Sequence, residues 1–151
     1  MVFASPVLSN AAPKDTKKAE ALYKQGAKLG MNMKLAEAVG MFQKATEADP
    51  TYAPAYNGWG LALSNMGKEP AAIEKYKKAV ELDPKLAKAY YNWGLTLNKI
   101  GKDKEAVEKL RTAARLDPTR SGEINDLVVK IQNQVKLQRK GKTGTVSPHH
   151  K

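Results

Sequence analysis

The hydrophobic residues of this chain recur at helical spacing, in segments that glycine and proline separate. Across residues 53–66 an apolar side chain returns every three or four positions, which is typical of one face of an α-helix. These positions are Tyr56, Trp59, Leu63 and Met66. Gly67 follows directly, where helices commonly end. No segment alternates between apolar and polar residues with a period of two, so the sequence predicts an all-α protein without a sheet.

A second helix is predicted directly after Gly67. Pro70 falls in the first turn of that helix, where its missing N–H costs no hydrogen bond. The apolar stripe of the helix comprises Ala72, Ile73, Tyr76, Ala79 and Val80. The helix should end at Asp83, because the residue before Pro84 is driven out of helical geometry. Residues 53–86 are therefore predicted to form a helical hairpin.

This hairpin repeats with a period of 34 residues. The run YNGWGLAL from Tyr56 to Leu63 returns as YYNWGLTL from Tyr90 to Leu97. In the same way AVELDP at residues 79–84 returns as AARLDP at residues 113–118, and a fainter copy, ATEADP, ends at Pro50. Repeats of this length indicate a stacked array of hairpins rather than a globule with one centre.

Small residues occupy the same places in each copy. Glycine recurs at Gly26, Gly60 and Gly94, and alanine at Ala38, Ala72 and Ala106. Glycine inside a helix costs about 0.5–1 kcal/mol relative to alanine, so three glycines in register need a structural reason. We expect two helix backbones to approach closely at these positions.

Together these positions resemble the tetratricopeptide-repeat family. Its pattern places a large residue, glycine, alanine, an aromatic residue and proline at fixed spacing. The resemblance covers residues 19–52, 53–86 and 87–120, about 102 of the 151 residues. Leu110 departs from the aromatic position, and Met33 stands where the later copies have the glycine between the helices. The structural repeat positions are Gly26, Gly60, Gly94, Ala38, Ala72, Ala106, Pro50, Pro84 and Pro118.

We therefore predict an all-α, tetratricopeptide-like right-handed solenoid of three helix pairs plus one capping helix, with disordered termini. The capping helix follows from one apolar stripe that would cover the last repeat. Its members are Ile124, Leu127, Val128, Ile131 and Val135. The predicted segments are a disordered or residual signal segment (1–15), three repeats (16–52, 53–86 and 87–120), the capping helix (121–140) and a disordered basic tail (141–151).

Residues 1–12 are apolar or small and carry no charge. Ser9 and Ala11 have the spacing of the small residues at a signal-peptidase site, whereas a basic leader is absent. Two interpretations stay open. The segment is the end of a longer export signal of a periplasmic or secreted protein, or it is the disordered N-terminus of a cytoplasmic one.

The net charge of +11 is concentrated in the C-terminal part of the chain. Residues 87–120 and 121–151 each carry an excess of four positive charges, so eight of the eleven lie in the last 65 residues. Such a field attracts acidic proteins, anionic lipids or nucleic acid, and a well-solvated lysine-rich surface explains it equally. No apolar run approaches the roughly 18 residues that a membrane span needs.

The sequence offers no constellation for catalysis. It has no cysteine, and its two histidines, His149 and His150, are neighbours in the tail without further metal ligands nearby. The run from Gly141 to Thr143 matches the end of a phosphate-binding loop, but Lys136 stands where that loop needs a glycine. We therefore expect a protein that is not an enzyme and needs no metal or cofactor.

The family resemblance implies a binding groove. In tetratricopeptide-repeat proteins the first helix of each repeat lines a concave groove that binds an extended peptide or a partner's helix. Tyrosines supply apolar area with a polar tip there, and asparagines pair with the N–H and C=O groups of a peptide. Packing between repeats stays the alternative role for Leu61 and Leu95. The predicted groove residues are Tyr23, Asn57, Leu61, Asn65, Lys88, Tyr91, Leu95, Asn98 and Lys99, together with Ala27, Met31 and Ser64.

The leading hypothesis is a scaffold that recruits an acidic or neutral peptide of another protein. The alternative is binding of nucleic acid or an anionic membrane surface by the basic C-terminal half. Its cations are Lys102, Lys104, Lys109, Arg111, Arg115, Arg120, Lys130, Lys136, Arg139 and Lys140.

Family members that bind the C-terminal tails of chaperones use lysine, asparagine and arginine at five groove positions. Those positions are here Tyr23, Ala27, Gly58, Lys88 and Asn92. Compared position by position, only Lys88 is the residue that those family members have at the same place. We therefore expect the partner not to be a chaperone tail.

Overall fold

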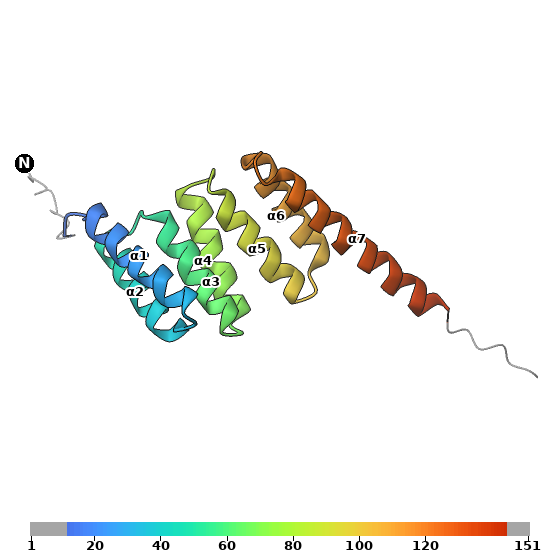
Figure 1. The fold of residues 1–151 in the computed structure, drawn as a ribbon, viewed down its shortest axis with the longest axis horizontal. Coiled ribbons are helices and arrows are strands. Elements are labelled where there is room, and N and C mark those ends of the chain that lie inside the picture. Colours follow the sequence, from blue (N-terminus) through green and yellow to red (C-terminus); the bar gives the residue numbers. More distant parts are fainter. Residues whose placement is uncertain (1–11, 145–151) are drawn as a thin grey trace, which may run out of the picture.

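The computed structural model describes residues 12–144 and folds them into α-helices joined by short turns (Figure 1). Within this range there is no strand, and no helix is long and apolar enough to cross a membrane. The predicted all-α solenoid is confirmed. Residues 1–11 of the candidate signal segment and both histidines lie outside the described residues, whereas Asp15, at the end of that segment, caps α1 by accepting a hydrogen bond from the backbone N–H of Lys18. The helices are α1 (Thr16–Met31), α2 (Leu35–Ala48), α3 (Ala53–Asn65), α4 (Glu69–Leu82), α5 (Ala87–Lys99), α6 (Asp103–Leu116) and α7 (Ser121–Thr143).

Consecutive helices pair into three hairpins, α1 with α2, α3 with α4 and α5 with α6. The hairpins stack in chain order, and α7 packs on α6 at the end of the stack (Figure 1). Each first helix also contacts the first helix of the next hairpin, so α1, α3 and α5 form one continuous layer. This layer carries the site described below.

The repeated glycine in the first helix of each hairpin packs against a large side chain of the second helix. A Cβ atom on Gly60 would lie 2.6 Å from Tyr76 Cε1 and 3.0 Å from the carbonyl oxygen of Ala72. At Gly94 the nearest atom would be Leu110 Cγ, at 2.7 Å. The two helices of a hairpin therefore approach so closely that only a hydrogen atom fits.

The turn inside each hairpin uses one residue in the left-handed region. Gly67 and Gly101 hold φ angles of +75° and +79° there. Met33 occupies the same place in the first hairpin with a φ of +59°. A residue with a Cβ atom is strained in this conformation, so the first hairpin adopts the common turn at a cost that the other two avoid.

The aspartate before each repeated proline caps the turn to the next hairpin. Asp49 Oδ1 accepts hydrogen bonds from the backbone N–H of Thr51 at 2.9 Å and from its hydroxyl group at 2.7 Å. Asp83 and Asp117 accept from the backbone two residues on in the same way. The Asp-Pro pair thus both ends a helix and stabilises the following turn.

Helix α7 covers the apolar side of α6 with Ile124, Val128 and Ile131, as the predicted capping stripe implies. Its end differs from the predicted boundary, because the helix continues past residue 140 to Thr143. The hydroxyl group of Thr143 donates to the carbonyl oxygen of Lys140 at 3.0 Å. Lys140 and Lys142 lie in the last turn, where positive charge is favourable to the helix dipole.

Candidate functional site

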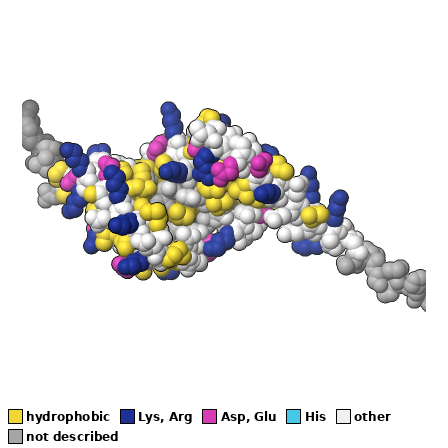
Figure 2. Space-filling view, in the orientation of Figure 1, with side chains coloured by type: hydrophobic (Ala, Val, Ile, Leu, Met, Phe, Trp, Pro, Cys, Tyr) yellow, Lys and Arg dark blue, Asp and Glu magenta, His cyan; other side chains and the backbone are white. Residues whose placement is uncertain are grey.

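The layer of first helices is hollowed into a groove of about 420 Å³, which we call the first-helix groove. Helices α1, α3 and α5 supply most of its lining, and Arg120 closes one end. Hydrophobic side chains gather over these helices, with lysine and arginine side chains around them (Figure 2). The lining residues are Tyr23, Ala27, Gly30, Met31, Leu35, Phe42, Asn57, Gly58, Leu61, Ala62, Asn65, Lys88, Tyr91, Asn92 and Arg120.

The charge of the groove is entirely positive. Lys88 and Arg120 belong to its lining, and no aspartate or glutamate does. The guanidinium group of Arg120 lies over the ring of Tyr91 at 4.5 Å and also donates to Glu123 at 3.0 Å. Glu123 therefore holds Arg120 in place and pairs with its charge, while Lys88, which forms no ion pair among residues 12–144, offers positive charge to a bound group.

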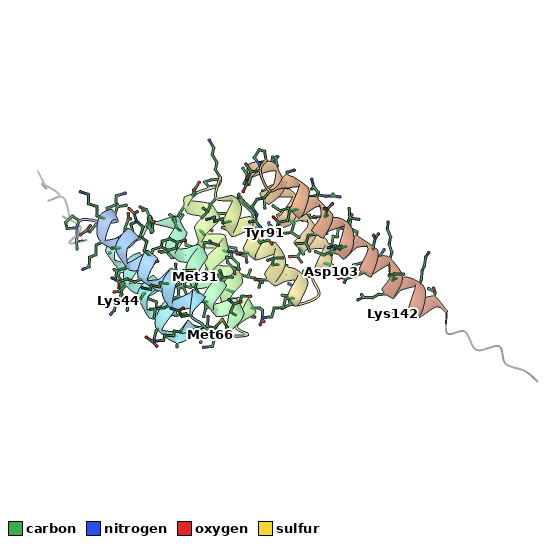
Figure 3. The ribbon with its side chains drawn as sticks, in the orientation of Figure 1. Met31, Lys44, Met66, Tyr91, Asp103 and Lys142 are labelled. Carbon is green, nitrogen blue, oxygen red and sulfur yellow. The ribbon has the colours of Figure 1, made fainter. Side chains whose placement is uncertain are left out.

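The opposite end of the groove is apolar. Met31 at the end of α1 and Leu35 at the start of α2 line it, and Leu61 of α3 adds a side chain that is 42% exposed. Met31 and Tyr91 come from α1 and α5, the two helices that flank α3 (Figure 3). A peptide lying across α3 would therefore contact apolar side chains near the end of α1 and cations near α5.

Amide side chains form the floor between these two ends. Asn57 is only 6% exposed, and its Oδ1 accepts a hydrogen bond from Asn92 Nδ2 at 3.0 Å. This bond joins α3 to α5, and the Nδ2 group of Asn57 remains as a donor for a backbone carbonyl group. A second bond, from Thr96 Oγ1 to Ser64 Oγ at 3.1 Å, joins the same two helices. Polar groups thus fix the spacing of the repeats beneath the groove.

Six of the nine predicted groove residues line this groove, and three do not. The six are Tyr23, Asn57, Leu61, Asn65, Lys88 and Tyr91. The three that lie outside it are Leu95, Asn98 and Lys99, which belong to the second half of α5. Leu95 is 36% exposed, so its side chain is accessible but does not face the cavity.

Asn98 and Lys99 lie outside the groove because neighbouring helices engage their polar groups. Asn98 Nδ2 donates to Asp103 Oδ1 at 2.8 Å. Lys99 Nζ lies 2.7 Å from Glu69 Oε1 and 2.8 Å from the carbonyl oxygen of Ser64. The hydrogen bond from Lys99 lowers the pKa of the Glu69 carboxyl group. Both residues therefore tie elements together, which the repeat pattern does not reveal.

Arg120 is the groove residue that the sequence analysis assigned elsewhere, to the basic C-terminal half. It follows α6 and precedes α7, so no first-helix position in the repeat pattern points to it. Asn92 was considered only as a position for chaperone binding. All five of those positions, Tyr23, Ala27, Gly58, Lys88 and Asn92, line the groove.

The fold is a solenoid of helical hairpins whose first helices, α1, α3 and α5, carry a groove. Comparison with protein families matches residues 65–101 to the TPR repeat and residues 87–120 to the tetratricopeptide repeat. The chain therefore contains tetratricopeptide repeats within residues 65–120. No curated protein sequence matches it significantly.

Several solved structures, among them two TPR domains, have the same fold. The first TPR of Spaghetti (RPAP3), bound to the HSP90 peptide SRMEEVD, is 25% identical with a TM-score of 0.75 over 82% of this chain and 97% of that one. The TPR2B domain of yeast Sti1, in a pHsp70 complex, is 25% identical with a TM-score of 0.73 over 78% and 98%. The translocator chaperone SycD of Yersinia enterocolitica is 21% identical with a TM-score of 0.74 over 82% and 90%.

Proposed function

We propose that this protein is a scaffold that binds an acidic, partly apolar peptide of a partner protein in the first-helix groove. The observation that carries this proposal is the composition of the lining: cations at one end, apolar side chains at the other, amides between them and no carboxylate. Extended peptides are recognised by such a combination, because backbone groups need amide partners while charge and apolar contacts select the side chains.

The arrangement of charged and apolar side chains also favours one orientation of a bound peptide in the groove. Acidic side chains or a terminal carboxylate would lie near Lys88 and Arg120, since charge-assisted hydrogen bonds are available only there. Apolar side chains of the peptide would lie against Met31, Leu35 and Leu61 at the opposite end. The proposed partner sequence therefore separates an apolar segment from an acidic one.

Two of the similar structures are complexes, one with an HSP90 peptide and one with pHsp70, which supports a peptide partner here. At the five matching positions this chain has only one cation, Lys88. We therefore keep the prediction that its partner is not a chaperone tail. In a direct test, SRMEEVD should bind no better than a scrambled peptide of the same composition, and tight binding would contradict this part of the proposal.

The alternative inferred from the sequence, binding of nucleic acid or an anionic membrane surface, has no counterpart among the similar structures reported above. We therefore develop only the peptide-binding function.

Capture of partners from native extract, with identification by mass spectrometry, tests the groove assignment. Leu61→Asp places a carboxylate on the groove wall and should remove the specific partners. Leu95→Asp is the matched control, because Leu95 is the equivalent residue one repeat later, is similarly exposed and lies outside the cavity. Retention of the same partners by Leu61→Asp, or equal loss in both variants, would show that the groove is not the binding site.

Charge reversal tests the acidic character of the captured peptide. Lys88→Glu should weaken binding by about tenfold or more, since it removes a cation from the groove and introduces repulsion. Lys85→Glu, which changes net charge equally at an exposed position outside the groove, should change binding only slightly. Equal effects of both variants in fluorescence anisotropy would assign the attraction to net charge alone.

A further inference from the structure

Helix α7 is much longer than α3 and α5, the first helices of the second and third hairpins. It has 23 residues, whereas α3 and α5 have 13 each. At a rise of 1.5 Å per residue the difference is about 15 Å. The second half of α7 therefore runs past the turn between α5 and α6 and projects from the stack (Figure 1). Capping α6 alone does not require this extension.

A second cavity of about 650 Å³ lies between α7 and the N-terminal half of α6, and we call it the α6–α7 trough. Its apolar lining comes from the fully or partly buried side chains of Val107, Ile131 and Val135. Asp103, at the start of α6, belongs to the trough, and Lys142 marks the projecting end of α7 beyond it (Figure 3). The trough shares no lining residue with the first-helix groove.

Basic side chains outnumber acidic ones around this trough. Five cations belong to its lining, Lys102, Lys104, Arg111, Lys136 and Arg139. The carboxylates are Asp103, Glu105 and Glu108. Among residues 12–144 none of these five cations forms an ion pair, whereas Lys99 and Arg120 do. Their charges are therefore available to a guest.

We propose that the α6–α7 trough is a second docking site, which binds an acidic amphipathic helix of a partner protein. Each of the helices α1, α3 and α5 packs against the second helix of its own hairpin, and within the described residues α7 has no such companion. An incoming helix would lay its apolar face on Val107, Ile131 and Val135 while its acidic flanks meet the unpaired cations.

Other occupants fit the lining less well. Nucleic acid would leave the apolar floor of Val107, Ile131 and Val135 without a contact, whereas the apolar face of a helix would cover it. A second copy of this chain carries a net charge of +11, and its first repeat, residues 19–52, has no excess of acidic residues to offer. Charge complementarity therefore selects an acidic partner.

The test uses the full chain and a fluorescein-labelled synthetic helix of about four turns, with a leucine stripe flanked by glutamates. Fluorescence anisotropy measures its dissociation constant, and a scrambled peptide of the same composition serves as the probe control. Val135→Asp should weaken binding by about tenfold or more. Val129→Asp on the same helix should leave it within about twofold, because Val129 is 53% exposed and lies outside the trough.

A second matched pair separates the trough from general electrostatics. The double variant Lys136→Glu with Arg139→Glu should abolish binding, and Lys130→Glu with Lys140→Glu, off the trough on the same helix, should retain most of it. Far-UV circular dichroism verifies that all variants stay helical. Leu61→Asp should leave this probe unaffected, which distinguishes failure of this site from failure of the first-helix groove.

Three results would overturn the proposal: no binding of the helix, equal binding of the scrambled peptide, or equal losses in both members of a matched pair. A single-stranded oligonucleotide provides the remaining comparison. If it binds more tightly than the helix and loses binding on reversal of Lys136 and Arg139, the trough serves nucleic acid instead.

Discussion

Replacing Gly60 by alanine tests whether the repeated glycine sets the distance between the two helices of a hairpin. The added Cβ would lie 2.6 Å and 2.8 Å from the Cε1 and Cδ1 atoms of Tyr76, and 3.0 Å from the carbonyl oxygen of Ala72. Tyr76 is fully buried, so its ring has no open space into which to swing. The carbonyl oxygen belongs to the backbone of α4, so relief requires α3 and α4 to move apart.

Two opposing contributions decide the sign of the effect. Overpacking of a filled site costs about 1–3 kcal/mol. Alanine in place of glycine inside a helix restores about 0.5–1 kcal/mol. We therefore expect Gly60→Ala to lower the free energy of unfolding by about 1–2 kcal/mol. For a chain of this length that corresponds to a fall in melting temperature of about 2–8 °C.

Gly40 provides the matched control inside α2. A Cβ at Gly40 would meet nothing within 4 Å, so only the backbone contribution remains. Gly40→Ala should raise the free energy of unfolding by about 0.5–1 kcal/mol. Urea denaturation of all variants at one temperature and pH measures both changes, with helix content followed by circular dichroism at about 222 nm. If Gly60→Ala stabilises the protein as much as Gly40→Ala does, close packing at the repeated glycine is refuted.

Three further predictions concern the same scaffold. Met33→Gly should stabilise the protein by about 1 kcal/mol in urea denaturation, because it relieves the left-handed φ of +59° that glycine adopts freely in the later turns. Ala72→Leu, at a fully buried position, should cost about 1–3 kcal/mol, and an unchanged melting temperature would contradict the packing described above. Hydrogen bonds from Thr51 and Thr16 lower the pKa of Asp49, so the stability they contribute is complete above the ordinary carboxyl pKa of about 4 and is lost as pH falls through the lowered value. The wild type should therefore lose more stability between about pH 5 and pH 2 than Asp49→Asn, and parallel melting curves across that range would exclude this role.

The repeat pattern predicted more of the fold than of the site. Six groove positions followed from the family resemblance because a repeat fixes which face of a helix a residue occupies. The same reasoning placed Asn98 and Lys99 in the groove, although Asp103 and Glu69 engage their polar groups. Helical periodicity predicts which face of its own helix a residue occupies. It does not predict which polar group of another helix lies close enough to bond with it.

The sequence by itself determined the helical hairpins, the period of 34 residues, the turns at each repeated proline and the need for small residues at Gly26, Gly60 and Gly94. These features depend on residues close together in the chain or on the periodicity of one helix, so they can be predicted locally. Only the tertiary structure decided that Arg120 closes the groove over Tyr91 and that α7 leaves a trough beside α6. Both features depend on distances between helices that the chain order does not encode, since packing of whole surfaces sets those distances.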